Sequence, residues 1–172
     1  MSDQPNRGGG VTTRTHISKA VVSLLEARPV DTKRAIKPGG FWYEVDGDWR
    51  RWCESEMADW IEGAQLYKVE IGSDVRLLRI ATLEEFDAFH REYVIVEPYP
   101  GARTLYPDWK RVATRFDGIE IAPYQWDRRM DFGTFWYYGW DCASGVLWEP
   151  RNTTVELVGP VVRATPEDAD GR

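Results

Sequence analysis

A short polar loop set between aromatic residues is the part of this sequence best suited to hold a ligand. Residues 136–150 read WYYGWDCASGVLWEP, in which four of the first five positions are aromatic, a polar loop spans 141–145 and an apolar strand follows. Flat rings as walls, with a few polar atoms to fix orientation, are how many ligand pockets are built. The alternative is that these rings form the core or a protein-binding face.

Acidic side chains near this loop are candidates for electrostatic catalysis. Asp141 lies between Trp140 and Cys142, where aromatic walls would strengthen the effect of its charge. Glu120 is flanked by two isoleucines and must point away from both, and we expect it to be solvated rather than an acid in a cleft. Cys142 is a weaker candidate, as a nucleophile, because neither histidine of the chain lies beside it in sequence.

The charge balance limits the class of partner. The 172 residues include 22 Lys and Arg against 28 Asp and Glu, a net charge of −6, with the basic residues scattered. This balance disfavours a nucleic-acid partner. Locally, Arg128 and Arg129, flanked by Asp127 and Asp131, could grip a pyrophosphate or form an ion-paired loop, and the ion-paired loop is the commoner arrangement.

Cysteine and histidine usage bears on metal sites and disulfides. Cys53 and Cys142 are the only cysteines, the chain has two histidines, and none has the spacing of a zinc site, so we expect neither a metal site nor a disulfide scaffold. No apolar run approaches the ~20 residues that span a bilayer. We therefore expect no membrane partner and a cytoplasmic protein.

Length and end composition predict the domain organisation. A chain of this length is most economically one domain. We expect a disordered N-terminal segment at 1–15, a single globular α+β domain at 16–164 and a disordered acidic tail at 165–172.

Periodicity and turn residues predict the elements that position the candidate residues. A capping box at Thr82–Glu85 opens an amphipathic helix, and Asp108 caps another. Residues 17–25 fit a helix or a strand, with a helix favoured. Strands are predicted at 41–45, 65–71, 75–80, 119–121, 146–148 and 153–158, a helix from 48 onward, a Pro-rich connector at 96–107 and an exposed loop at 123–134. This mixed order favours an α+β fold with helices packed on a mixed, mostly antiparallel sheet.

Three stretches, in the right order, resemble parts of the ADP-ribosyltransferase fold, in particular the small toxin-like transferases of bacteria and phages. The stretch 39–52, GGFWYEVDGDWRRW, resembles the second strand of the family and the helix after it. The stretch 107–119, PDWKRVATRFDGI, resembles a helix followed by YDGI, with Phe116 in place of the tyrosine. The stretch 144–150, SGVLWEP, resembles a late strand that usually begins with glutamate.

The resemblance implies NAD as a substrate. The family splits nicotinamide from NAD and passes ADP-ribose to a protein, a nucleic acid or a small molecule. Carried over residue by residue, Arg28 would hold the dinucleotide from the first strand, with Lys37 as its substitute. Trp42 or Tyr43 would clamp nicotinamide, and because adjacent strand residues face opposite sides, only one of the two can face the pocket.

The resemblance also implies a late acid. Ser144 lies where the family has its catalytic glutamate, so Asp141, Glu149 or Glu120 would have to supply the charge beside it. Losing such an electrostatic contact typically costs ~100- to 1,000-fold in rate.

The proposed pocket requires two distant segments to meet. We expect the ring-rich hairpin near the C-terminal end, with Trp140, and the strand at 41–45, with Gly40 before it, to lie side by side in one sheet and enclose a crevice. The favoured hypothesis is then an NAD-binding, ADP-ribosyltransferase-like protein. It would be a phage or bacterial effector that modifies a host macromolecule, such as a host protein, and it would act in the host cytoplasm if phage-encoded. The alternative is a non-catalytic protein-binding module that uses an exposed Trp- and Tyr-rich surface.

Overall fold

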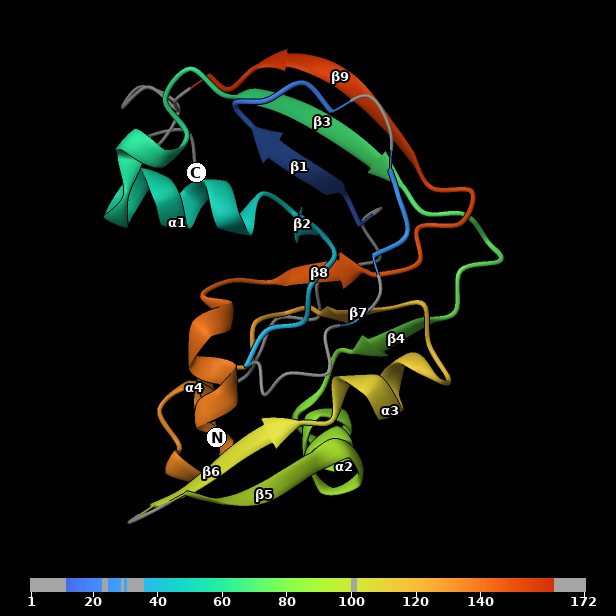
Figure 1. The fold of residues 1–172 in the computed structure, drawn as a ribbon. Helices are drawn as coiled ribbons and strands as arrows, with labels where there is room; N and C mark the ends of the chain where they lie inside the picture. The colour runs from blue at the N-terminus through green and yellow to red at the C-terminus, as the bar shows by residue number, and fades with distance from the viewer. Residues whose placement is uncertain (1–11, 23–24, 29, 31–35, 100–101, 163–172) are drawn as a thin grey trace, which may run out of the picture.

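The strands of the molecule form a seven-stranded sheet and a separate two-stranded hairpin (Figure 1). The computed structural model describes residues 12–22, 25–28, 30, 36–99 and 102–162. In spatial order the strands are β4 (Leu77–Ile80), β7 (Gly118–Ile121), β8 (Ser144–Leu147), β2 (Phe41–Val45), β1 (Arg14–Ser18), β3 (Gln65–Glu70) and β9 (Thr154–Pro160). Only the pairing of β4 with β7 is parallel; the other neighbouring strands pair antiparallel. This mixed, mostly antiparallel sheet with packed helices confirms the predicted α+β class.

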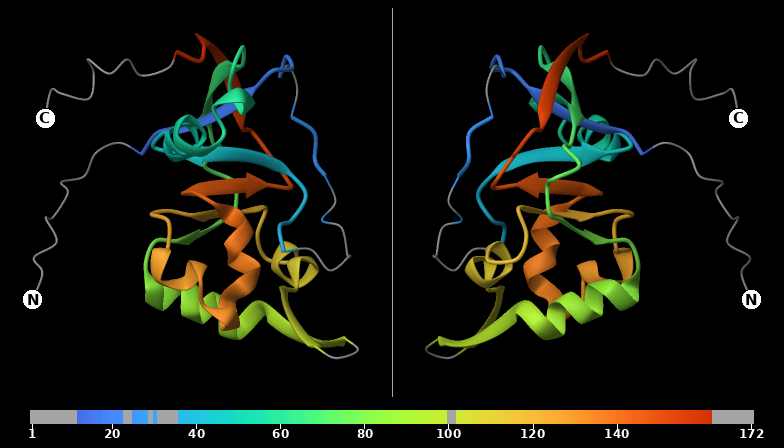
Figure 2. Two further views of the ribbon diagram at one scale, coloured as in Figure 1. Left: turned by 90° about the vertical axis from the view of Figure 1, so that its left-hand side faces the viewer. Right: turned by 90° about the vertical axis from the view of Figure 1, so that its right-hand side faces the viewer.

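The helices divide between the two halves of the sheet (Figures 1 and 2). The upper half of Figure 1 holds α1 (Asp48–Glu56) and the 3₁₀ turn η1 (Ala58–Trp60), close to β1 and β3. The lower half holds α2 (Leu83–Tyr93), α3 (Trp109–Ala113), α4 (Trp126–Arg129), the 3₁₀ segment η2 (Phe132–Trp140) and the hairpin of β5 (Val94–Tyr99) and β6 (Ala102–Pro107). No helix in the described ranges is long and apolar enough to cross a membrane.

Local capping fixes where two of these helices begin. At α2 the backbone N–H of Glu85 donates to Thr82 Oγ1 at 3.2 Å, and the N–H of Thr82 donates to Glu85 Oε2 at 3.0 Å. At α3 the Asp108 carboxylate accepts from the N–H of Arg111 at 3.0 Å. Each cap pairs helix donors that would otherwise lack a partner, which stabilises a helix by about 1 kcal/mol. Both predicted helix starts are confirmed.

Most of the aromatic stretch belongs to the core. Trp136 and Tyr137 of η2 are fully buried and pack against Phe86 of α2. The rings of Phe86 and Trp136 stack with centroids 5.4 Å apart and planes at 5°. Buried strand residues in the same cluster include Ile80, Ile119, Ile121 and Val146. Such rings supply the large apolar area that holds the helices on the sheet.

The strands β2 and β8 lie side by side, as the proposed crevice requires. Tyr43 pairs with Gly145 in the antiparallel register. A Cβ atom at position 145 would lie 2.2 Å from the Tyr43 ring, so only glycine leaves room for that ring. The close approach of Tyr43 to the β8 backbone therefore depends on this glycine.

Pairing with distant strands overturns the expectation for the start of the domain. Arg14 and Thr15 lie in β1, inside the segment expected to be disordered, and Ile17 and Ser18 end this strand rather than begin a helix. The cause is tertiary, since β1 hydrogen-bonds to β2 on one side and β3 on the other. Residues 1–11 and the expected tail at 165–172 lie outside the described residues.

Two further expectations about connecting segments are wrong. The Pro-rich connector at 96–107 falls mostly within the β5–β6 hairpin, where strand pairing outweighs the prolines. The expected loop at 123–134 contains α4 and the start of η2. The ring-rich segment before β8 is therefore 3₁₀ rather than the arm of a hairpin.

Candidate functional site

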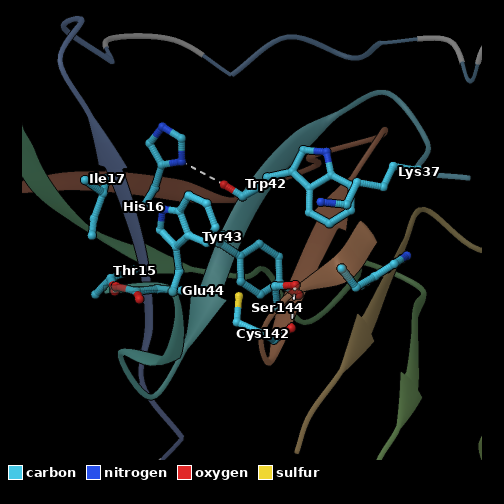
Figure 3. Close-up of a pocket in the computed structure, with 11 residues that line it drawn as sticks. Thr15, His16, Ile17, Lys37, Trp42, Tyr43, Glu44, Cys142 and Ser144 are labelled. Carbon is cyan, nitrogen blue, oxygen red and sulfur yellow. Dashed lines mark hydrogen bonds between the residues drawn. The ribbon is translucent and has the colours of Figure 1, made fainter. Parts of the chain in front are cut away.

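A cavity of about 300 Å³ lies where β1, β2 and β8 meet α1 and η2 (Figure 3). Three tryptophans contribute to its wall: Trp42 from β2, Trp49 from α1 and Trp140 from η2. Polar groups come from Glu44 and Ser144, and Lys37 lies beside Trp42. The structure thus brings together Trp42, Trp140, Lys37 and Ser144 from the predicted site.

Strand alternation separates the two residues predicted to compete for the nicotinamide position. The Tyr43 hydroxyl donates to Glu120 Oε2 at 2.9 Å, so the polar end of this side chain is directed to a buried acid. Tyr43 still forms part of the cavity wall. The Trp42 ring meets Trp140 edge-on, with centroids 5.0 Å apart and planes at 68°. Lys37 Nζ lies 5.4 Å from the centroid of the Trp42 ring, within cation–π distance.

Glu44 is a cavity residue that the sequence reasoning missed. Its side chain comes from β2, and the residue is only 3% exposed. Glu44 Oε1 accepts from Thr15 Oγ1 at 2.5 Å, and Oε2 accepts from the backbone N–H of Arg50 at 2.8 Å. A carboxylate in a low-dielectric site is strongly attracted to a positive ligand. The sequence feature that could have identified it is the single acid in the otherwise apolar strand FWYEV.

Burial makes the thiol and the imidazole at the cavity poor reactants. Desolvation, with a smaller contribution from the Asp48 charge, raises the pKa of Cys142 to about 12, so its thiol is protonated at neutral pH. The Ser144 hydroxyl donates to the Cys142 carbonyl at 3.1 Å rather than to a base. Burial lowers the pKa of His16, which keeps its ring neutral, and His16 Nδ1 lies 2.7 Å from the Trp42 carbonyl. Among the described residues that line the cavity, no base is paired with the Cys142 thiol or the Ser144 hydroxyl to activate it as a nucleophile.

Glu120 is not the solvated residue that the sequence predicted. It is 5% exposed and accepts from Arg14 Nε at 2.6 Å and Arg14 Nη2 at 2.8 Å, in addition to Tyr43. The reason is that Arg14 of β1 reaches across the sheet to it. Its two oxygens accept three hydrogen bonds, so Glu120 links β7 to β1 and β2.

The other predicted acids do not line the cavity either. Asp141 is next to Lys37, with Oδ2 at 3.6 Å from Lys37 Nζ. The backbone N–H of Glu149 donates to the Asp117 carbonyl at 3.0 Å, beyond the end of β8. Neither Asp141 nor Glu149 is among the residues that line the cavity.

The two remaining predicted residues line a separate cavity. Arg28 and Gly40 border a space of about 380 Å³, which shares Trp42 and His16 with the first. Arg28 is not on the first strand, because β1 ends at Ser18, so the first-strand arginine of this chain is Arg14. The Arg28 backbone N–H donates to the Trp148 carbonyl at 2.8 Å.

The described residues of this site do not form a cluster of metal ligands. In the part of the chain that the structure describes, no group of three or more His, Cys, Asp and Glu residues could hold a metal ion. What the site does offer is aromatic walls, one buried carboxylate and a lysine beside one of the rings. This fold and site define an α+β protein with a small aromatic cavity. No known protein family, curated protein or solved structure matches the chain.

Proposed function

We propose that this chain binds a nucleotide of the NAD type, with the nicotinamide ring in the cavity between Trp42, Trp140 and Glu44. The observation that carries the proposal is a tryptophan-lined cavity with one buried carboxylate. Aromatic faces attract a flat cationic ring, and a desolvated carboxylate adds to that attraction. The nicotinamide ring of oxidised NAD is both flat and cationic.

The size of the cavity limits how much of the nucleotide it encloses. A volume of about 300 Å³ is at the lower end for small-molecule sites, which run from ~300 to ~1,000 Å³. The cavity therefore suits the nicotinamide and its ribose, with the rest of the dinucleotide lying outside. Lys37, beside Trp42, is placed to meet the negative charge that follows the ribose.

ADP-ribosyl transfer is the reaction implied by the resemblance. For this reaction, Glu44 rather than a residue at position 144 would act as the catalytic glutamate. In this reaction the bond from ribose C1′ to the nicotinamide nitrogen breaks, and its electron pair leaves with nicotinamide. An acceptor nucleophile forms the new bond to C1′ and releases its proton to water. A carboxylate stabilises the positive charge that develops on the ribose.

Calorimetric titration of the protein with NAD and with nicotinamide riboside tests the binding proposal. Glu44→Gln should weaken the binding of both ligands at least tenfold, because among the described residues Glu44 supplies the one carboxylate of the cavity wall. Glu149→Gln, outside the cavity, is the matched control. Glu44→Gln also alters a buried hydrogen-bonded group, so Trp42→Leu provides a second test. This variant should weaken the binding of both ligands while β2 keeps its other contacts. If the wild-type chain binds neither ligand at millimolar concentration, the proposal is wrong.

A second candidate function is supported by a patch of exposed apolar side chains on α4 and η2. Phe132 is 91% exposed, Trp126 63% and Phe135 57%, and Met130 and Tyr138 are also exposed. The rings of Phe135 and Tyr138 stack at 5.5 Å. Large exposed aromatic groups of this kind are typical of protein-binding hot spots.

This aromatic patch suits a non-catalytic protein-binding module, or the docking face for a host protein acceptor. The double variant Phe132→Ser, Phe135→Ser should abolish capture of a stoichiometric partner from a host lysate while NAD titration is unchanged. Val162→Ser, which changes an exposed apolar residue at the C-terminal end of the described residues, is the control. Equal capture by the wild type and the double variant would exclude the patch as the binding face.

A further inference from the structure

Two cations outside the main ion pairs of the fold share a single carboxylate. Asp141 Oδ2 lies 3.6 Å from Lys37 Nζ, and Asp141 Oδ1 lies 4.0 Å from Arg129 Nη2. Charge-assisted hydrogen bonds are typically about 2.8 Å long, so both contacts are too long to be such bonds. The neighbouring Arg128 shows the difference, since it holds Asp87 through two bonds of 2.8 and 2.7 Å.

Two aromatic rings hold Arg129 in place, in addition to its long contact with Asp141. Its guanidinium lies 5.5 Å from the Trp126 ring and 5.3 Å from the Tyr138 ring. Its Nε atom is buried and has no hydrogen-bond partner within the described ranges. An arginine whose planar fork is pre-positioned without a two-bond partner is suited to a phosphate, whose oxygens match that fork.

The backbone at Asp141 is strained into the position that places its carboxylate between these cations. Asp141 has φ 62° and ψ −35°, and the N–H of Cys142 donates to the Trp140 carbonyl at 2.7 Å across it. This is a γ-turn with positive φ, a rare and strained turn for a residue other than glycine. Its carboxylate is about one quarter exposed, so it can turn toward water without crossing the core.

We propose that Lys37 and Arg129 form the phosphate subsite of the nucleotide site, and that the Asp141 carboxylate occupies this subsite until a phosphate displaces it. The inference rests on the proposed function. Lys37 lines the cavity, and Asp141 directly precedes Cys142 in the cavity wall, so the subsite adjoins the space assigned to nicotinamide and ribose. A phosphate carries more negative charge than the carboxylate and can form short hydrogen bonds to both Lys37 and Arg129.

The subsite has a specific signature in calorimetric titrations with two ligands that differ by one phosphate, nicotinamide riboside and nicotinamide mononucleotide. The wild-type protein should bind the mononucleotide at least tenfold more tightly, with an advantage that shrinks as salt increases. Arg129→Gln should remove this advantage and leave riboside binding unchanged, because Arg129 does not line the cavity. Lys37→Gln should remove the advantage as well. Arg129→Lys, which keeps the charge without the fork, should retain part of it. Arg128→Gln, whose partner is Asp87, should retain all of it.

Asp141→Asn tests the displacement itself. Because it removes the competing charge and keeps the shape of the side chain, it should tighten the mononucleotide severalfold and leave the riboside unchanged. Weaker mononucleotide binding by this variant would overturn the displacement. Equal binding of mononucleotide and riboside by the wild-type protein would overturn the subsite.

Inorganic pyrophosphate separates failure of the subsite from failure of the proposed function. If neither nicotinamide ligand binds but pyrophosphate does, and Arg129→Gln abolishes that binding, the subsite stands and the NAD assignment is wrong. If the riboside binds and pyrophosphate does not, the nicotinamide cavity stands and the subsite is wrong. Unchanged denaturation midpoints of Arg129→Gln and Asp141→Asn establish that each result reports binding rather than unfolding.

Discussion

At the scale of single residues, the structure separates acids that hold the fold from the acid that lines the cavity. Glu120 and Asp117 are both buried and both paired with arginine, Glu120 with Arg14 and Asp117 with Arg76. Glu44 is buried too, but its hydrogen-bond partners are the Thr15 hydroxyl and a backbone N–H, and no salt bridge pairs it with a cation among the described residues. An acid of this kind attracts a cationic ligand, whereas the ion-paired acids do not.

Glu120→Gln should therefore reduce stability and leave ligand binding intact. The substitution leaves Arg14 without its ion-pair partner in a largely buried position, and removing one member of such a pair costs about 3 kcal/mol. Urea denaturation followed by Trp fluorescence measures the change, with Glu149→Gln as the control. If the variant were as stable as the wild type but lost nicotinamide binding, Glu120 would instead belong to the site.

His16 makes part of the stability depend on pH. Burial, the main cause, lowers its pKa below the ordinary value of 6.5, although the Trp42 carbonyl opposes this. Between the folded pKa and 6.5 the unfolded chain holds a proton that the folded chain does not, so stability falls as pH falls below about 6.5. In urea titrations from pH 7.5 to 5.0, His16→Gln should lose less stability than the wild type. A steeper loss in the variant would contradict this assignment.

At the scale of secondary-structure elements, the pairing of β2 with β8 depends on one glycine. Gly145→Ala places a methyl group against the Tyr43 ring, which is confined by its bond to Glu120. We expect a loss of about 1–3 kcal/mol, the usual cost of overpacking a core. The double variant Gly145→Ala, Tyr43→Leu should recover part of the loss, and urea denaturation of the single and double variants measures it. Full stability of Gly145→Ala alone would show that the ring can move aside.

Elements whose signals are local were predictable from the sequence. The capping box at Thr82–Glu85 and the cap at Asp108 identify helix starts because the bonds lie within three residues. The aromatic and β-branched residues at 41–45 likewise identify β2 from local composition. In contrast, β1 and the β5–β6 hairpin carry weak local patterns, and their formation depends on pairing.

The same distinction applies to the candidate site. Trp42, Trp140 and Ser144 could be grouped from the sequence because the two ring-rich stretches were expected to meet. Glu120 was misplaced because its partner Arg14 lies 106 residues away in sequence. Glu44 was missed because its bonds to β1 and to the start of α1 become visible only in three dimensions.

At the scale of the whole molecule, the cavity joins segments from both halves of the fold. Its wall includes β1 and α1 from one half and η2 and β8 from the other (Figures 1 and 3). A ligand that binds only the folded chain should thus stabilise the molecule as a unit, by RT ln(1 + [L]/Kd). We expect nicotinamide riboside at 100 times its Kd to raise stability by about 2.7 kcal/mol, measured as a shift of the single urea transition. A shift confined to part of the transition would indicate two halves that unfold separately.

The position of β1 has a practical consequence. This five-residue strand comes first in the described chain yet lies between β2 and β3, so it alone joins β4–β7–β8–β2 to β3–β9. A chain that begins at Lys19 would expose two unpaired strand edges, and a synthetic peptide of residues 12–18 could restore the missing pairing in trans. The molecule is thus a natural candidate for a split reporter, in which reassembly of two fragments recovers the folded signal.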